Sequence, residues 1–461
     1  MFATVLPHRG RPVGRPRRLL PLAAVLVLAV AVSSHAEAAA PASSFTLANG
    51  MEVVVVPDHR VPVVTHVLWY KVGGAEDPKG QAGVAHFLEH MMFRGTKRFP
   101  ADSFDKFVVS LVGTTANAFT SHEYTKYPQS LPKQKLAELM ELEADRMINL
   151  EIREDDVKPE IGAVLNERRG KEVSPLFLFY EKLGAARFPD HPYGRSLLGS
   201  PDDIKALDRA RTLAFYQRFY APNNAILVVA GDVTESEVRA LAEKTYGRVP
   251  ARPVPKRILH PLPERPLKGR VEMQHEQVTL PSIGFYYTTP GVAATPRADA
   301  HALNLLSQIA GTSIIGRLHR RLVTGKQLAM SVSASYSLNV HAGTLAFTAT
   351  AAPGVPLPEV ERALAAEIAA LARDGVTEAE LEDARHSLLA SRAYSADNHR
   401  NRADTYGVGR VAGLTLAEIE AAYDHISRLT LADVNRAAAE TIGKAQLVIG
   451  DLRPLTVGTA K

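Results

Sequence analysis

Three residues in one short segment have the types and the spacing of a metal-dependent hydrolytic site. His86, Glu89 and His90 form a His-x-x-Glu-His pattern within residues 82–93, which contain no helix breaker after Gly83 and are predicted to form a helix. Residues four apart share a helix face, so both imidazoles can bind one metal ion. Glu89 can reach a metal-bound water and act as a general base, as in the inverted zinc-peptidase motif.

A catalytic zinc ion usually has three protein ligands and leaves the fourth position for water, so a third ligand must lie elsewhere. The best candidate is Glu167, in a helix predicted from about residue 155 to 169. Glu160 lies about two turns earlier on the same face and could orient the site from outside the ligand set. We therefore predict one Zn²⁺ per chain, which would lower the pKa of its bound water to about 7.

The chain that must position these residues divides into two similar halves. Its 461 residues suggest two domains, and six prolines between residues 249 and 266 predict a stiff, extended linker. The halves end alike, in Leu227–Val233 and Leu447–Leu452, which indicates an internal duplication. The position matching the zinc motif falls near His301–Leu305, where the required residues are missing, so one half alone would carry the chemistry.

The patterning favours an α+β fold of two homologous lobes, each an antiparallel-rich sheet covered by helices, related by approximate two-fold symmetry. The catalytic zinc-binding lobe is predicted over residues 44–248, the Pro-rich linker over 249–266 and the non-catalytic lobe over 267–455. Asn49-Gly50 predicts a two-residue turn, with positive φ angles, between the first two strands. A further strand is expected at residues 63–72, and shorter strands near 115–120 and 124–130.

The N-terminus has the order of a secretory signal peptide, predicted over residues 1–40. Five arginines precede an apolar run at residues 19–32, and Ala36-Glu37-Ala38 follows as a plausible cleavage site. The run is shorter than the roughly 20 residues that span a bilayer, so no stable membrane anchor is expected after processing. We therefore expect an exported protein of the bacterial periplasm.

Composition excludes several classes of function. The formal charge of +5 reflects the N-terminal arginines, and the mature chain is near neutrality, which argues against a nucleic-acid partner. The chain has no cysteine, so disulfides, thiolate catalysis and cysteine zinc sites are excluded. A nucleotide-binding reading of the glycine-rich residues 407–413 has the wrong spacing, and no Gly-x-Ser-x-Gly segment indicates a serine hydrolase.

The sequence closely resembles the pitrilysin and insulinase metallopeptidases, especially the two-lobed type that includes the mitochondrial processing peptidase. The resemblance rests on residues 83–96 around the zinc motif, on Glu160 with Glu167, and on Tyr-Ala-Pro-Asn-Asn-Ala at residues 220–225. The separation 167 − 90 = 77 agrees with the spacing in this family. The resemblance implies a zinc-dependent endopeptidase that cleaves extended peptides or small unfolded polypeptides.

The resemblance also implies how the peptide substrate is bound. Asn117, Ala118 and Phe119, followed by Thr120, match an edge strand that pairs with an extended peptide. Main-chain hydrogen bonds of this kind supply affinity without demanding a particular sequence. An ordinary structural strand is the alternative interpretation. His191-Pro192-Tyr193-Gly194 also matches the family and is interpreted as a structural turn.

The sequence departs from the family at one place. Relatives complete the site with an arginine and a tyrosine seven residues apart in the second lobe, but Val323 and Met330 occupy these positions here. Arg320 and Arg321 are nearby but out of register. We therefore expect a heterodimer in which a homologous, zinc-free partner supplies the missing pair. The alternative is a structural or assembly subunit of the same fold without turnover.

Overall fold

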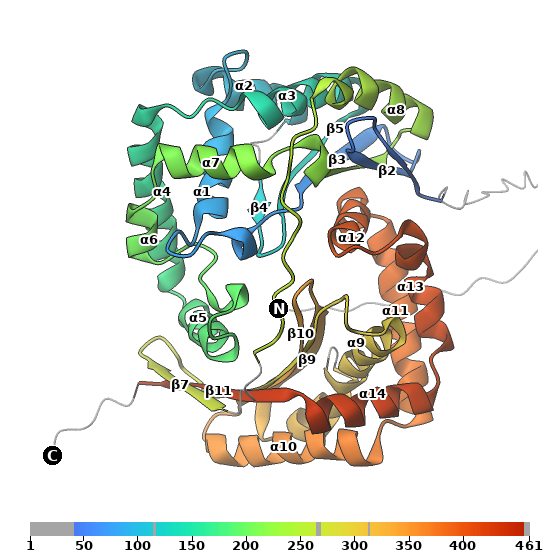
Figure 1. The fold of residues 1–461 in the computed structure, drawn as a ribbon. Helices are drawn as coiled ribbons and strands as arrows, with labels where there is room; N and C mark the ends of the chain where they lie inside the picture. The colour runs from blue at the N-terminus through green and yellow to red at the C-terminus, as the bar shows by residue number, and fades with distance from the viewer. Residues whose placement is uncertain (1–40, 114–116, 264–268, 312–313, 456–461) are drawn as a thin grey trace, which may run out of the picture. The chain divides into compact units, whose positions relative to one another are not determined.

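The computed structural model describes residues 41–113, 117–263, 269–311 and 314–455, and the predicted signal peptide at 1–40 lies outside them. These residues form two β-sheets covered by helices (Figure 1). The described residues include no helix that is long and apolar enough to cross a membrane. The fold is α+β with two sheets, as the sequence predicts.

The first sheet contains six strands in the order β1-β2-β6-β3-β5-β4. β2 and β6 are parallel, and every other neighbouring pair is antiparallel. The strands are β1 (Ser43–Thr46), β2 (Glu52–Pro57), β3 (Val63–Tyr70), β4 (Phe119–Thr120), β5 (Thr125–Pro132) and β6 (Ala225–Gly231). β4 therefore lies at an edge of this sheet.

The second sheet repeats the topology of the first. Its order is β7-β11-β8-β10-β9, which is the order of the first sheet without β1, and its parallel pair, β7 with β11, occupies the same place. The strands are β7 (Gly269–His275), β8 (Ser282–Pro290), β9 (Ala329–Leu338), β10 (Ala342–Ala351) and β11 (Gln446–Pro454). The matched endings predicted from the sequence are β6 and β11, which occupy equivalent positions.

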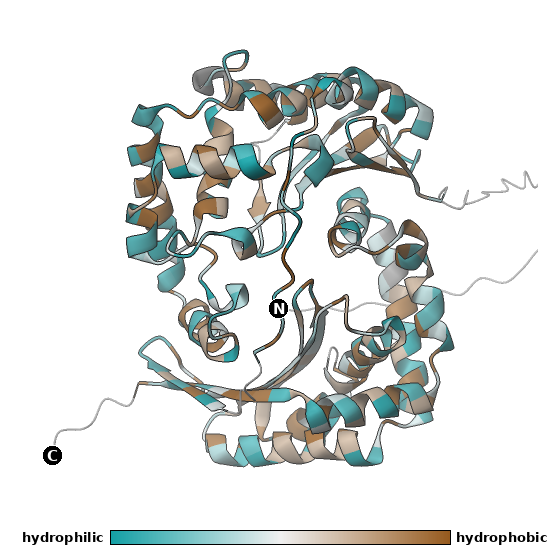
Figure 2. Ribbon diagram, in the orientation of Figure 1, coloured by the Kyte–Doolittle hydropathy of each residue, from teal (hydrophilic) through white to brown (hydrophobic). Residues whose placement is uncertain are grey.

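Helices connect the strands of each sheet. Before the linker they are α1 (Val84–Met91), α2 (Ala101–Val112), α3 (Leu136–Asn149), α4 (Glu154–Glu172), α5 (Pro175–Arg187), α6 (Pro201–Lys205), α7 (Arg209–Phe219) and α8 (Glu235–Lys244). After it they are α9 (Arg297–Gly311), α10 (Leu357–Asp374), α11 (Glu378–Ala396), α12 (His399–Val411), α13 (Leu416–Arg428) and α14 (Leu431–Lys444). Hydrophilic and hydrophobic residues alternate along α10 and α14, as expected for helices that cover a sheet (Figure 2).

Both faces of the first sheet are buried, which explains why its central strands are continuous apolar runs. On one face Val53, Val55 and Leu227 join the main core with α1, α3 and α7. On the other, Val54 and Trp69 pack against Ala403 of α12, a helix from the second half of the chain. The second face of this sheet is therefore covered by α12, a helix from far along the sequence.

The second sheet has the reciprocal arrangement. One face packs against α9, α10 and α14 from its own half. On the other face, Tyr286 and Val448 pack against Phe179 and Leu183 of α5, a helix from the first half. Each sheet is thus covered in part by a helix of the opposite half.

The glycine-rich segment at 407–413 serves packing rather than nucleotide binding. Gly407 lies in α12, where an added Cβ would be 2.1 Å from the indole of Trp69. Gly409 is equally close-packed, because a Cβ there would be 2.6 Å from Ile419. Gly407 therefore allows α12 to approach the first sheet and Gly409 allows it to approach α13, and a helix rather than a strand precedes this segment.

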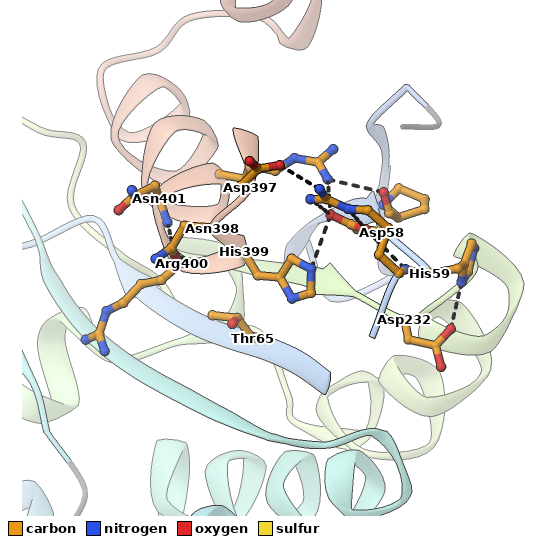
Figure 3. Close-up of polar contacts among 12 residues, drawn as sticks. Asp58, His59, Thr65, Asp232, Asp397, Asn398, His399, Arg400 and Asn401 are labelled. Carbon is orange, nitrogen blue, oxygen red and sulfur yellow. Dashed lines mark hydrogen bonds and ion pairs between the residues drawn. The ribbon is translucent and has the colours of Figure 1, made fainter. Parts of the chain in front are cut away.

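Polar contacts fasten the start of α12 to the end of β2 (Figure 3). The carboxylate of Asp58, which directly follows β2, lies 3.2 Å from His399 Nε2 and 3.3 Å from an Arg402 nitrogen. Arg60 donates to the same carboxylate and also to Asp397, at the end of α11. These ion pairs connect segments that are far apart in the sequence, because Asp58 and Arg402 are separated by 344 residues.

The loop after β1 differs from the one predicted from the sequence. The turn after β1 is longer than the two-residue hairpin predicted from Asn49-Gly50, and of these two only Gly50 has a positive φ angle. Asn49 instead donates its side-chain amide to the carbonyls of Tyr246 and Val249, so a distant contact determines this loop.

In the linker, residues 251–263 form neither helix nor strand, while the exact lobe boundaries remain a prediction.

Candidate metal centre

The helix that carries the histidine motif, α1, begins in a tightly built turn. Gly83 has a φ of 91°, and a Cβ there would lie 2.4 Å from the carbonyl oxygen of Leu198. The carboxylate of buried Asp77 accepts the Gly83 N–H at 2.6 Å and the Ala85 N–H at 3.0 Å. Asp77 thus satisfies two N–H groups at the start of the helix, although it lies too far upstream to be recognised as a cap from the sequence.

The three predicted metal ligands converge, although they come from two helices. His86 and His90 extend from α1, and Glu167 extends from α4. Glu167 Oε2 lies 3.5 Å from His86 Nε2 and 3.3 Å from His90 Nε2. One ligand atom from each of the three residues lies within 4.8 Å of the other two. Ligand atoms bound at about 2.0–2.1 Å to a tetrahedral ion are separated by about 3.3 Å, so this arrangement fits zinc.

Glu160 contacts His90 rather than the predicted metal position. Its carboxylate lies 2.8 Å from His90 Nδ1 and also accepts a hydrogen bond from Arg94. The His90 Nδ1 atom therefore donates its hydrogen to Glu160, so His90 would bind a metal through Nε2 once that nitrogen has lost its own hydrogen. Arg94, four residues after His90, was not given a role from the sequence.

Burial and hydrogen bonding set the charges of these groups. Burial, with the neighbouring His90, lowers the pKa of His86 to about 4, so this ring is neutral and able to coordinate. Burial also lowers the pKa of His90, but the hydrogen bonds to Glu160 and Glu167 outweigh it and raise the pKa to about 9. The hydrogen bond from His90 lowers the pKa of Glu167 to about 2, which keeps this carboxylate ionised.

Glu89 lies beside the ligands but is held by a different partner. Its side chain is buried, and the hydroxyl of Thr120 in β4 donates a hydrogen bond to its carboxylate. Burial raises the pKa of Glu89, which suits a group that must take up a proton. Thr120 was seen only as part of the strand motif, although strand alternation places it on the face opposite its exposed neighbour Phe119.

A cavity of about 830 Å³ joins the metal ligands to the predicted substrate strand. Asn117, Ala118 and Phe119 line it together with His86 and Glu89. Phe119 is 50% exposed, and β4 is the outermost strand of its sheet, so its free edge is available for pairing. The structure thus brings the predicted substrate residues to the predicted metal site. Tyr193 of the His-Pro-Tyr-Gly turn also lines the cavity, and its hydroxyl donates to Glu123.

The positions of the missing arginine and tyrosine lie in the second half of the chain. Met330 is 62% exposed at an irregularity near the start of β9, where the pairing with β10 shifts register. Val323 lies in the preceding turn of π-helix, His319–Gly325. Arg320 is engaged in an ion pair with Glu380. None of these side chains lines the cavity at the metal ligands.

Two family models match this chain. The family model described as "Insulinase (Peptidase family M16)" matches residues 52–201, and "Peptidase M16 inactive domain" matches residues 206–388. "Zinc protease PqqE" of Helicobacter pylori is 32% identical over 375 residues, which cover 79% of this chain and 83% of that protein.

Solved structures show the same fold. The crystal structure of a protease from Helicobacter pylori has a TM-score of 0.82 and 27% identity, and the match covers 90% of this chain and 99% of that one. The first half of the periplasmic protease PqqL from Escherichia coli has a TM-score of 0.78 and 22% identity, with coverage of 90% and 93%. The chain belongs to the pitrilysin/insulinase family of peptidases, peptidase family M16.

Proposed function

We propose that this protein is a zinc-dependent endopeptidase that cleaves extended peptides or small unfolded polypeptides. The observation that carries the proposal is the convergence of His86, His90 and Glu167 within one 4.8 Å group. Glu89 and the free edge of β4 lie in the same cavity. A structural subunit without turnover would not need the ligands, the base and an open strand edge together.

Each residue of the site has a separate part in this chemistry. Bound zinc would acidify a water molecule and polarise the peptide carbonyl. Glu89 takes the proton from the attacking water and passes it to the leaving amine nitrogen, while Thr120 holds its carboxylate in place. Glu160 holds the ring of His90 through its Nδ1 hydrogen, so that Nε2 faces Glu167.

The substrate binds as an added strand. Backbone groups of residues 117–119, which lead into β4 at the free edge of the first sheet, pair with an extended peptide, whose scissile carbonyl is then presented to the zinc site. Binding of this kind depends on main-chain groups, so broad sequence tolerance is expected. It also requires an unfolded segment, which restricts substrates to peptides and unstructured polypeptides.

A partner subunit completes the site. Val323 and Met330 replace the arginine and tyrosine of full-length relatives, so we propose a heterodimer with a homologous, zinc-free chain that supplies this pair. The predicted signal peptide of this chain supports export to the bacterial periplasm, so we propose that the two subunits assemble there. The purified chain should cleave peptides poorly until that partner is added, and full activity of the chain alone would contradict the heterodimer.

The test of the activity separates metal binding from catalysis. Glu89→Gln should retain about one zinc per chain by elemental analysis and lose cleavage of a quenched fluorescent peptide by at least about 100-fold, since the proton carrier is removed. Glu154→Gln is the matched control, because Glu154 is an exposed residue in the first turn of α4. Unchanged turnover in Glu89→Gln would show that the proposed base is wrong.

A further inference from the structure

A second cavity, of about 520 Å³, adjoins the metal cavity. His122, Tyr180, Gly184 and Tyr193 line both cavities, so the two share a wall. This wall includes α5, which also packs on the second sheet through Phe179 and Leu183. The second cavity therefore lies where a bound peptide could continue beyond the metal site.

Arg187, the last residue of α5, is a buried cation that pairs with no carboxylate in the part of the chain that the structure describes. It lines the second cavity and is only 8% exposed. Its terminal nitrogen donates to the hydroxyls of Thr288 and Thr344, at 3.1 and 2.7 Å, and its Nε is buried without a hydrogen-bond partner. The two other buried arginines among the described residues, Arg146 and Arg168, both pair with glutamates.

An unpaired buried charge is costly, so its retention calls for an explanation. Burial lowers the pKa of Arg187 to about 10. Among the described residues, Glu123 is the only acidic one that lines this cavity, and its carboxylate already accepts hydrogen bonds from Tyr193 and from the Val340 N–H. No carboxylate of the described residues therefore pairs with this cation, whose guanidinium lies over the rings of Phe188 and Tyr286, and it faces a cavity that an anion could enter.

The remaining wall of the cavity suits a small polar anion. Ser333, Ser335 and Ser337 alternate along β9 and line it from one face of the strand. Thr344 and Thr348 line it from β10 in the same way. Hydroxyl groups can donate to carboxylate oxygens that the guanidinium does not reach. Where α5 covers the same face of the sheet, apolar residues such as Tyr286 and Val448 pack against it.

We propose that Arg187 and the surrounding hydroxyls bind a carboxylate of the peptide substrate while another segment of that peptide occupies the metal site. The assignment of the ligand as a peptide rests on the proposed peptidase function. Tyr180, which lines both cavities, and Arg187 are seven residues apart on α5, or about 10 Å along the helix axis. This length corresponds to about three residues of extended peptide.

Either the C-terminal carboxylate or an acidic side chain could supply this group. The test measures peptide binding to the Glu89→Gln protein, in which cleavage is blocked. A series of eight-residue fluorescent peptides is prepared with a free C-terminal acid, with a C-terminal amide, and as amides with one glutamate at each position. Binding is followed by fluorescence anisotropy at pH 7 and low ionic strength.

The acid, or one glutamate-containing amide, should bind about tenfold or more tightly than the plain amide, a factor that corresponds to about 1.4 kcal/mol. Arg187→Gln should bring the two affinities together, and Arg187→Lys should restore part of the difference. Lys182→Gln, which removes an exposed positive charge from the same helix, should retain the full difference. A preference of the C-terminal acid identifies the end of the substrate as the ligand, whereas a preference confined to one glutamate position identifies a side chain.

Two results would overturn the carboxylate site. One is equal affinity of the Glu89→Gln protein for all three kinds of peptide. This result can be obtained with Arg187 unchanged. The other is a preference that survives Arg187→Gln in a protein whose unfolding midpoint shows that it is folded. If the preference is present but protein with an intact Glu89 cleaves none of the peptides even with the partner subunit added, the peptidase proposal fails while the carboxylate site stands.

Discussion

Glu160→Gln tests whether the contact between Glu160 and His90 tunes the metal site. The Glu160 carboxylate accepts from two donors, His90 Nδ1 at 2.8 Å and the guanidinium of Arg94. A glutamine has one acceptor oxygen, and its amide nitrogen can only donate. The substitution therefore keeps the shape of the side chain but leaves one of the two donors facing an N–H group.

The expected magnitude follows from the burial of this contact. The Glu160 side chain is 8% exposed, so water cannot replace the missing acceptor. A hydrogen bond to a charged group contributes about 1.5–3 kcal/mol, and removing the partner of a metal-bound histidine typically weakens metal binding by about 10–100-fold. We expect the zinc Kd to rise by about this factor, which corresponds to about 1.4–2.7 kcal/mol.

The assay is competition for zinc between the purified protein and a chromophoric chelator of known affinity at pH 7.5. Glu172→Gln provides the matched control, because Glu172 lies at the end of the same helix and pairs with Arg168 outside the ligand set. Circular dichroism shows whether each variant remains folded without metal. The zinc Kd of the control should match that of the unsubstituted protein.

A zinc Kd that changes less than twofold in folded Glu160→Gln would refute the reasoning. It would mean that the His90 ring is held by its place on α1 alone. An equal rise in the Kd for Glu160→Gln and Glu172→Gln would also refute it, since the cause would then be the helix as a whole.

Two further predictions concern stability. Asp77→Ala should lower the free energy of unfolding in urea by about 1–2 kcal/mol and weaken zinc retention, because two N–H groups at the start of α1 lose their acceptor. Asp77→Asn should have a smaller effect, and an unchanged urea midpoint for Asp77→Ala would contradict the prediction. Burial lowers the pKa of His191 to about 4 and of His341 to about 3, so both rings are neutral when folded and the unfolded chain takes up protons first, from about pH 6.5 downward. The free energy of unfolding should therefore fall as the pH drops from 6.5 toward 4, by at most about 1.4 kcal/mol per pH unit for each ring, and His341→Gln should reduce this slope while the exposed His386→Gln should not.

Local periodicity made part of the site predictable. His86, Glu89 and His90 share a helix turn, and Glu160 and Glu167 are two turns apart, so their relative positions follow from helix geometry alone. The Pro-rich linker and the matching strand endings likewise reflect local composition. The predicted α+β fold agrees with the structure, and β4 lies at the edge of its sheet. Of the strand expected near 115–120, however, only Phe119–Thr120 form it, and 115–116 lie outside the described residues.

Contacts between distant segments were not predictable in the same way. Asp77 is six residues before the first N–H that it accepts, and Thr120 is 31 residues from Glu89, so neither spacing corresponds to a periodic element. The exchange of α5 and α12 between the two sheets was missed as well. Nothing in an amphipathic helix specifies which sheet its apolar face will cover.

The sequence by itself determined which residue types could bind a metal, on which helices they lie and which half of the chain carries them, because these properties depend on spacing within single elements. Only the tertiary structure decided that Glu167 reaches both imidazoles, that Thr120 holds Glu89 and that Arg187 is buried without a carboxylate partner. Those outcomes depend on how segments far apart in the chain pack against one another. Packing is a property of the whole core, and no short stretch of sequence contains it.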